Sequence, residues 1–221
     1  MNQIKSVLIV DDHPIIVVAM KSLIESRMPK WQLMSAASRA DALRACDESA
    51  PSLAIIDLML PDGNGMDLIR EILRKAPECK VLVFSMQCEL RYGPRVFREG
   101  AKGYLMKGEK ISRLFDAIQL IEDGKTYCSE NLREVMMQHW TQRPNVVATC
   151  DSLSTREFQI FRMLGQGQTS KEIGSSLSIS PKTVESHREN MKKKLSCNTS
   201  NELVLRARDW LHLDEGDAAV L

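Results

Sequence analysis

Short apolar runs alternate with longer amphipathic stretches over residues 1–125. The apolar runs predict five β-strands, at Val7–Val10, Gln32–Ala36, Leu53–Ile56, Val81–Phe84 and Gly103–Met106. The stretches between them repeat apolar residues at a spacing near that of a helical turn, which predicts amphipathic helices. Strands that are apolar throughout and alternate with helices form a parallel sheet covered on both faces. The pattern therefore predicts an α/β domain with a five-stranded, doubly wound parallel sheet.

The pattern changes after about residue 125. One further helix is expected over Glu130–Trp140, followed by a linker without helical spacing over Thr141–Cys150. Residues beyond it show only helical spacing, with capping residues at Ser154 or Thr155, Thr169, Ser180, and Thr199 or Ser200. We thus expect an α/β domain at 1–125, a linker helix and flexible linker at 126–150, a small all-α domain at 151–211, and an acidic tail at 212–221.

One predicted helix contains a proline. Residues 88–100 follow the fourth strand and should be helical, yet Gly93 and Pro94 lie within them. A proline inside a helix removes a hydrogen bond and costs about 3 kcal/mol. We therefore expect this helix to be short, to be kinked, or to begin at Pro94.

Composition narrows the classes of protein that fit. Of the 221 residues, 43% are hydrophobic and 27% are charged, which is ordinary for a globular chain of two domains. The net charge of +1 points to no particular partner. The six cysteines form no CxxC pair, so we expect reduced thiols rather than a zinc site. We find no signal peptide and no apolar run of about 18 residues, and we expect a cytoplasmic protein without a membrane partner.

Polar side chains stand at the carboxyl ends of four predicted strands. These side chains are Asp11, Asp12, Asp57, Ser85 and Lys107. In doubly wound sheets ligands bind outside the carboxyl ends of the strands. Taken singly, each residue is an ordinary solvated loop side chain. Together they predict a Mg²⁺ site in which Asp57 attacks a phosphoryl group, whose oxygens the lysine and the hydroxyl would hold.

The segments that carry these residues, IVDDHP, IIDLMLPDGNG and GAKGYLMK, resemble the receiver domain of bacterial two-component response regulators, a flavodoxin-like fold. The resemblance implies that Asp57 accepts a phosphoryl group from a sensor histidine kinase. It also implies that Mg²⁺ is bound by Asp11, Asp12 and Asp57 together with the backbone carbonyl of Met59.

The same resemblance assigns the remaining receiver residues. Ser85 matches the switch hydroxyl that moves to the phosphoryl group, and Lys107 matches its cationic partner. Tyr104 matches the aromatic side chain that changes rotamer when the hydroxyl moves; the alternative is a strand residue that is simply packed at the sheet edge. Lys107 is followed by Gly108, where many receivers have a proline.

The C-terminal segments resemble a DNA-binding domain of the LuxR type. They read LSTRE from residue 153, GQTSKEI from residue 167 and ISPKTVESH from residue 179. In a helix-turn-helix the recognition helix enters the major groove with its N-terminal residues near base edges. The resemblance implies base contacts by Glu185, Ser186 and Glu189. It implies phosphate or flanking contacts by Lys182, Thr183, His187, Arg188 and Lys192.

Two features of this region keep alternatives open. Two of the positions expected to contact bases, Glu185 and Glu189, are acidic. Acidic side chains are unusual there, because the groove is lined with phosphates. Glutamate can accept a hydrogen bond from cytosine, but Glu185 and Glu189 can instead form i,i+4 ion pairs along their helix.

The last helix has Leu203, Val204, Leu205 and Ala207 in close succession. The resemblance implies a dimer contact at Val204, whereas all four residues would otherwise belong to the core of the domain.

The whole chain thus resembles a response regulator of the NarL/LuxR class. This class implies a transcription regulator whose phosphorylation promotes homodimerisation and binding to double-stranded promoter DNA, with RNA polymerase as a candidate partner. No enzymatic activity is expected beyond Mg²⁺-dependent acceptance of the phosphoryl group and slow self-dephosphorylation. Two other classes compete: an aspartyl-phosphate enzyme of the haloacid-dehalogenase kind, and a regulator whose degenerate receiver only dimerises. The first needs a DxDx motif after the first strand, and the second needs active-site positions to be missing.

Overall fold

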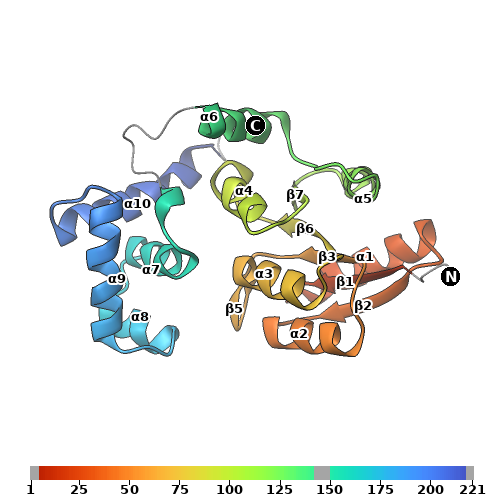
Figure 1. The fold of residues 1–221 in the computed structure, drawn as a ribbon, viewed down its shortest axis with the longest axis horizontal. Coiled ribbons are helices and arrows are strands. Elements are labelled where there is room, and N and C mark those ends of the chain that lie inside the picture. The colour runs from red at the N-terminus through yellow and green to blue at the C-terminus, as the bar shows by residue number, and fades with distance from the viewer. Residues whose placement is uncertain (1–4, 142–149, 218–221) are drawn as a thin grey trace. The chain divides into compact units, whose positions relative to one another are not determined.

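A computed structural model describes residues 5–141 and 150–217 of the chain. It forms two compact units, Met1–Gln142 and Arg143–Leu221 (Figure 1). Each unit has its own hydrophobic core.

The first unit is built on a five-stranded sheet. Its strands are β1 (Ser6–Val10), β2 (Gln32–Ala36), β3 (Leu53–Ile56), β6 (Lys80–Ser85) and β7 (Gly103–Met106). All neighbouring pairs are parallel, in the order β2-β1-β3-β6-β7. The predicted five-stranded parallel sheet is confirmed. Because the strand order reverses between β1 and β3, the carboxyl ends of these two strands flank the crevice where such sheets bind ligands.

Five helices cover the two faces of this sheet. They are α1 (Pro14–Arg27), α2 (Arg39–Glu48), α3 (Gly65–Lys75), α4 (Glu89–Arg98) and α5 (Ser112–Glu122). Apolar residues of α1 and α5 share one cluster with β1, β3, β6 and β7. In Figure 1, α2, α3 and α4 lie on the opposite face. A short hairpin of β4 (Met59–Leu60) and β5 (Gly63–Asn64) follows β3.

The proline does not delay the start of α4. The helix begins at Glu89, five residues before Pro94, so the expected start at Pro94 is wrong. Tyr92 and Val96 of this helix are 2% and 0% exposed. Their burial against the sheet offsets the hydrogen bond that the proline cannot make.

An additional helix, α6 (Glu130–Thr141), packs against α4 (Figure 1). Its Leu132 is fully buried. The segment that leads to it runs along the edge strand, where Tyr104 donates its backbone N–H to the carbonyl of Tyr127 at 2.9 Å. The helix expected within the linker at 126–150 is therefore packed on the first unit. The remainder of that linker, residues 142–149, lies outside the described residues.

The second unit is helical. It contains a 3₁₀ turn at Cys150–Ser152 and the helices α7 (Thr155–Gly165), α8 (Ser170–Ser176), α9 (Pro181–Lys194) and α10 (Ser200–Asp217). The predicted caps are confirmed: Ser154 with Glu157, and Thr169 with Glu172, form capping boxes, and the hydroxyl of Ser180 accepts from the N–H of Thr183. Helix α10 continues through Asp217, so most of the expected acidic tail at 212–221 is helical. No helix of the described residues is both long and apolar enough to cross a bilayer.

Candidate functional site

Three carboxylates meet at the crevice between β1 and β3. Asp11 and Asp12 follow β1, and Asp57 follows β3. Together with the ring of His13, each offers an atom that lies within 4.8 Å of the others. Asp11 and Asp57 are buried, at 2% and 4% exposure, whereas Asp12 is exposed. The sheet topology thus brings together the acidic residues that the sequence placed at separate strand ends.

The carboxylate of Asp57 is held by side chains at the carboxyl ends of β6 and β7. Ser85 donates its hydroxyl to Asp57 Oδ1 at 2.6 Å. Lys107 Nζ lies 2.5 Å from Asp57 Oδ2 and 2.7 Å from Asp11 Oδ2. Both oxygens of Asp57 therefore have a donor from another strand, one neutral and one cationic.

Lys107 remains positively charged in this environment. Burial would lower the pKa of its ammonium group, but the hydrogen bonds and charges of Asp11 and Asp57 together raise that pKa above its usual value. The lysine thus offsets part of the repulsion between the two buried carboxylates.

His13 is a member of the cluster that the sequence argument missed. Its backbone N–H donates to Asp11 Oδ1 at 3.0 Å. Its ring Nδ1 lies 2.8 Å from Asp12 Oδ1 and 3.1 Å from Asp11 Oδ1. The signal was its position directly after the two acids, before the proline that starts α1.

The backbone behind Asp57 requires a glycine. A Cβ at Gly65 would lie 2.4 Å from the carbonyl oxygen of Asp57 and 2.7 Å from Leu58 Cα. The N–H of Gly65 donates to the carbonyl of Leu58 at 3.0 Å. No side chain fits there, so the start of α3 can approach Asp57 only with glycine. The sequence did not reveal this contact.

Tyr104 lies behind the site in the core of the unit. Its ring is fully buried, and its hydroxyl donates to the carbonyl of Gln87 at 2.8 Å. Burial raises the pKa of this hydroxyl well above its usual value, so it stays a donor. The N–H of Gln87 in turn points to Ser85 Oγ at 3.4 Å. Tyr104 and Ser85 therefore contact the same loop between β6 and α4.

The donor set fits a small divalent cation. Three carboxylates at one edge of a sheet supply the hard oxygen ligands that Mg²⁺ prefers, with room left for water on the exposed side of Asp12. Met59 also lies at this edge, because its N–H points to Asp57 Oδ1 at 3.2 Å.

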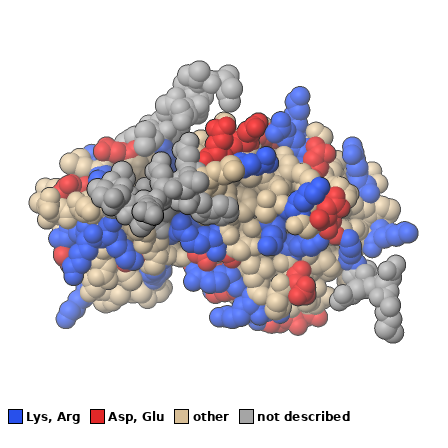
Figure 2. Space-filling view, turned by 45° about the horizontal axis from the view of Figure 1, so that its top comes forward, with Lys and Arg blue, Asp and Glu red and all other residues tan. Residues whose placement is uncertain are grey.

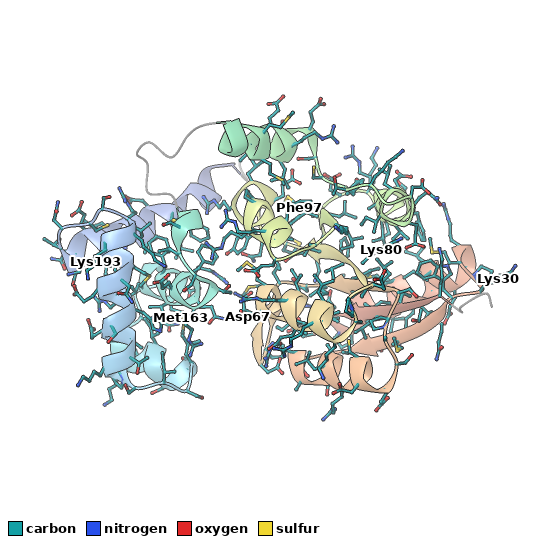
Figure 3. The ribbon with its side chains drawn as sticks, viewed as in Figure 1. Lys30, Asp67, Lys80, Phe97, Met163 and Lys193 are labelled. Atoms are coloured by element: carbon teal, nitrogen blue, oxygen red, sulfur yellow. The ribbon has the colours of Figure 1, made fainter. Side chains whose placement is uncertain are left out.

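The predicted DNA-contacting residues lie on α9. Those exposed are Lys182, Thr183, Glu185, Ser186 and Glu189, and those half-buried are His187, Arg188 and Lys192. Val184 and Met191 on the other face are completely buried and fix the helix in its unit. In Figure 2, Lys and Arg side chains lie on the surface of the C-terminal unit, at the left of the view, and also on that of the first unit. Lys193 extends outward from α9 (Figure 3).

The two acidic residues of α9 are paired within the helix. Glu185 Oε1 lies 3.1 Å from an Arg188 guanidinium nitrogen, and Glu189 Oε1 lies 2.8 Å from Lys192 Nζ. Both pairs are spaced i,i+3, one residue closer than the expected i,i+4. Ser170 of α8 joins the first pair, donating to Glu185 at 2.5 Å and accepting from Arg188 at 2.8 Å.

The four apolar residues of α10 divide between two environments. Leu203 and Ala207 are fully buried in the unit. Val204 is half-buried, and Leu205 is 56% exposed. Only part of the apolar surface of this helix is therefore used by the unit itself.

A doubly wound α/β unit with acids at its switch point, followed by a capped helix-turn-helix unit, defines a two-domain regulator. Comparison with known proteins gives the family. Residues 7–119 match the family model of the response regulator receiver domain, and residues 151–207 match that of bacterial regulatory proteins of the luxR family. The chain belongs to the response regulators of the NarL/LuxR class, with a receiver and a LuxR-type DNA-binding domain. Neither family model describes an enzyme domain.

Relatives are similar over nearly the whole chain. The response regulator UvrY of Escherichia coli is 29% identical over 198 residues, which cover 90% of this chain and 91% of UvrY. A putative transcriptional regulator of Pseudomonas aeruginosa is 32% identical, over 91% of this chain and 96% of the relative. The structure of RcsB from Salmonella enterica serovar Typhimurium, bound to promoter rprA with the phosphomimetic BeF3-, has a TM-score of 0.66. Its identity is 20%, over 91% of this chain and 97% of RcsB, so it supports the fold.

Proposed function

We propose that Asp57 accepts a phosphoryl group from the phosphohistidine of a sensor kinase. An oxygen of its carboxylate would attack phosphorus, the bond from phosphorus to the donor nitrogen would break, and an acyl phosphate would form. The observation that carries this proposal is the set of donors on Asp57. Ser85 and Lys107, from two adjacent strands, already contact its two oxygens.

Asp11, Asp12 and Asp57, with the backbone carbonyl of Met59, would hold Mg²⁺. When bound, this ion would neutralise charge that develops on the transferring phosphoryl oxygens. Lys107 would contribute a second positive charge to the same oxygens. Its raised pKa supports this role, since the group is fully protonated at neutral pH.

Ser85 and Tyr104 would change their contacts when Asp57 is phosphorylated. In the acyl phosphate, the Ser85 hydroxyl would donate to a phosphoryl oxygen instead of to the free carboxylate. The loop at Gln87 would follow, because both the Ser85 hydroxyl and the Tyr104 hydroxyl contact its backbone. Differential contacts of this kind bias a two-state surface.

Exposed apolar side chains near the site favour a protein as the phosphodonor. They lie on α1, on β4 and on loops that follow β6 and β7, and comprise Ile15, Val18, Met59, Met86 and Ile111. Their exposure ranges from 42% for Met59 to 78% for Ile15. Apolar surface around a polar centre is typical of a protein contact site.

The DNA-binding unit would place α9 in the major groove of promoter DNA. Lys182, Thr183, His187, Arg188 and Lys192 would contact phosphates and flanking bases. Glu185, Ser186 and Glu189 would face base edges. RcsB, which shares the fold, has been solved bound to promoter DNA. The chain would act in the cytoplasm as a transcription regulator, with RNA polymerase as a further partner.

Phosphorylation would promote dimerisation and promoter binding, with the dimer contact on DNA at Val204. The half-buried Val204 and exposed Leu205 support a contact outside the unit. We retain 1–125 as the receiver and 151–211 as the DNA-binding domain. Helix α6 would then be a packed extension of the receiver within the linker segment 126–150.

The test is labelling of the full chain by acetyl phosphate with Mg²⁺, read as intact mass. Wild-type protein should gain one phosphoryl group, and Asp57→Asn should gain none. Labelling that is equally efficient in EDTA would contradict the metal part. Continuous turnover of phosphodonors with many products per chain would favour an aspartyl-phosphate enzyme instead. Protein that never labels would favour the degenerate receiver.

A further inference from the structure

We propose that Asp62 is a positioning residue for the phosphoacceptor site. Its carboxylate ties the β4–β5 hairpin to the N-terminus of α2 and thereby holds Met59 against Asp57. The inference rests on the proposed function, in which the Met59 carbonyl is a metal ligand and Asp57 is the phosphoacceptor.

The tether consists of two hydrogen bonds between segments distant in sequence. Asp62 Oδ1 accepts from the N–H of Arg39 at 2.7 Å, and Oδ2 accepts from the N–H of Ala40 at 2.9 Å. The N–H groups of a first helical turn have no partner within the helix. Ser38, the cap of α2, satisfies the N–H of Asp41 at 3.1 Å. The hairpin thus supplies partners that the cap does not provide.

The Arg39 side chain holds the hairpin from a second direction. Its guanidinium forms a two-point contact with Glu71 of α3, at 2.9 Å and 2.5 Å. A Cβ at Gly63 would lie 2.9 Å from Arg39 Cδ, so the hairpin backbone lies directly against this side chain. Strands of two residues are too short to be stable alone, so the position of this hairpin depends on such contacts.

The same hairpin begins at the phosphoacceptor. Met59 is the first residue of β4, pairs with Asn64 of β5, and points its N–H to Asp57 Oδ1 at 3.2 Å. Release of Asp62 frees the tip of the hairpin from α2. The backbone of Met59 then loses its fixed place beside Asp57. Loss of outer contacts around metal ligands weakens metal affinity by about 10-fold or more.

The experiment compares full-length Asp62→Ala and Asp62→Asn with Ser38→Ala. Ser38→Ala weakens the same end of α2 but leaves the hairpin tether in place. Two quantities are measured: Mg²⁺ affinity by calorimetry without phosphodonor, and the rate of acetyl phosphate labelling as a function of Mg²⁺ concentration. Asp62→Ala should weaken Mg²⁺ binding about 10-fold and shift the half-maximal Mg²⁺ concentration equally. Saturating Mg²⁺ should restore most of the rate.

The control variants distinguish an effect of Asp62 on the position of the hairpin from a general weakening of α2. Asp62→Asn, which keeps an acceptor oxygen, should recover part of the Mg²⁺ affinity, and Ser38→Ala should bind Mg²⁺ as wild type does. Unchanged Mg²⁺ affinity in Asp62→Ala, or an equal loss in Ser38→Ala, would overturn the inference. Wild-type protein that binds Mg²⁺ but never labels would overturn the proposed function, while the calorimetric comparison would still decide the role of Asp62.

Discussion

Leu132 of α6 lies directly over Gly93 of α4. A Cβ at Gly93 would lie only 2.5 Å from Leu132 Cδ2, and Leu132 is fully buried. The absence of a side chain at Gly93 therefore leaves room for Leu132 of α6. Pro94 follows within the same helix, whose packing by Tyr92 and Val96 tolerates both residues.

This contact predicts a size-dependent coupling between the two positions. Leu132→Ala should destabilise the first unit by about 2–5 kcal/mol, because it leaves a cavity. Gly93→Ala should cost about 1–3 kcal/mol through overpacking. In the Leu132→Ala background the added methyl group has space, and alanine is favoured over glycine in a helix by about 1 kcal/mol.

Urea unfolding of the two single variants and the double variant checks this coupling. Gly93→Ala should be destabilising alone and stabilising in the presence of Leu132→Ala. Additive effects of the two substitutions would show that α6 does not rest on Gly93.

The lifetime of the acyl phosphate should depend on Met59. Met59 is 42% exposed and lies next to Asp57, where its thioether cannot orient an attacking water by hydrogen bonding. Hydrolysis should therefore be slow, and Met59→Asn should accelerate it. The decay of phosphorylated protein, followed by intact mass after removal of the phosphodonor, measures this rate. Met59→Leu serves as the apolar control, and equal decay of the Asn and Leu variants would refute the argument.

Most of the fold was predictable from the sequence, because the hydrophobic periodicity and the capping residues indicate the same helices and strands. Strands β1, β3, β6 and β7 are apolar over most of their length. Ser154, Thr169 and Ser180 cap the helices that they were expected to cap. The course of α4 was not predictable, since the cost of Pro94 is local whereas the packing that offsets it comes from distant residues.

The residues of the phosphoacceptor site were predictable from the sequence, whereas the contacts that hold the site from outside were not. Strand ends of a parallel sheet converge, so Asp11, Asp57, Ser85 and Lys107 could be placed together from their positions alone. Their hydrogen bonds confirm that convergence. The tether from Asp62 to α2 was not readable, because no local pattern links a turn residue to a helix start more than twenty residues earlier.

Acid should destabilise the second unit through Glu157. Burial would raise the pKa of this carboxyl, but Lys194 and the capping contacts with Ser154 lower it below its usual value. The unfolded chain, with a pKa of about 4.3, then binds the proton more readily than the folded chain. The stabilisation is complete above that value and is lost as the pH falls through the lower, folded pKa.

Thermal unfolding of wild type, Glu157→Gln and Lys194→Ala between about pH 6 and pH 3 tests this linkage. The Gln variant should lose less stability on acidification than wild type. Lys194→Ala should be intermediate, because it keeps the capping box. An identical pH dependence in all three proteins would exclude Glu157 as the titrating group.

Substitutions on α9 should distinguish residues that contact DNA phosphates from residues that contact bases. Lys182→Ala should weaken binding to all sequences alike and reduce the salt dependence, because a phosphate contact releases counterions. Glu185→Ala should change the preferred bases and also release Arg188, which it pairs with at 3.1 Å. Selection of binding sites from a random library, performed with both variants, compares the two. A uniform loss of affinity in Glu185→Ala, with unchanged preferred bases, would assign this residue only to the pairing of Arg188.

The dimer contact should depend on the outer face of α10. Two copies on a two-fold site roughly double the contacts that one small unit can make with DNA. Leu203 and Ala207 are used inside the unit, which leaves half-buried Val204 and exposed Leu205 for a second copy. Val204→Glu and Leu205→Glu should therefore abolish cooperative binding to a two-fold site while single half-sites remain bound.

Sedimentation with and without beryllofluoride should show a dimer only for the activated wild type. Because Val204 also packs within its unit, Leu205→Glu separates dimer loss from misfolding, and unchanged circular dichroism is required of both variants. Cooperative binding that survives both substitutions would place the dimer contact elsewhere.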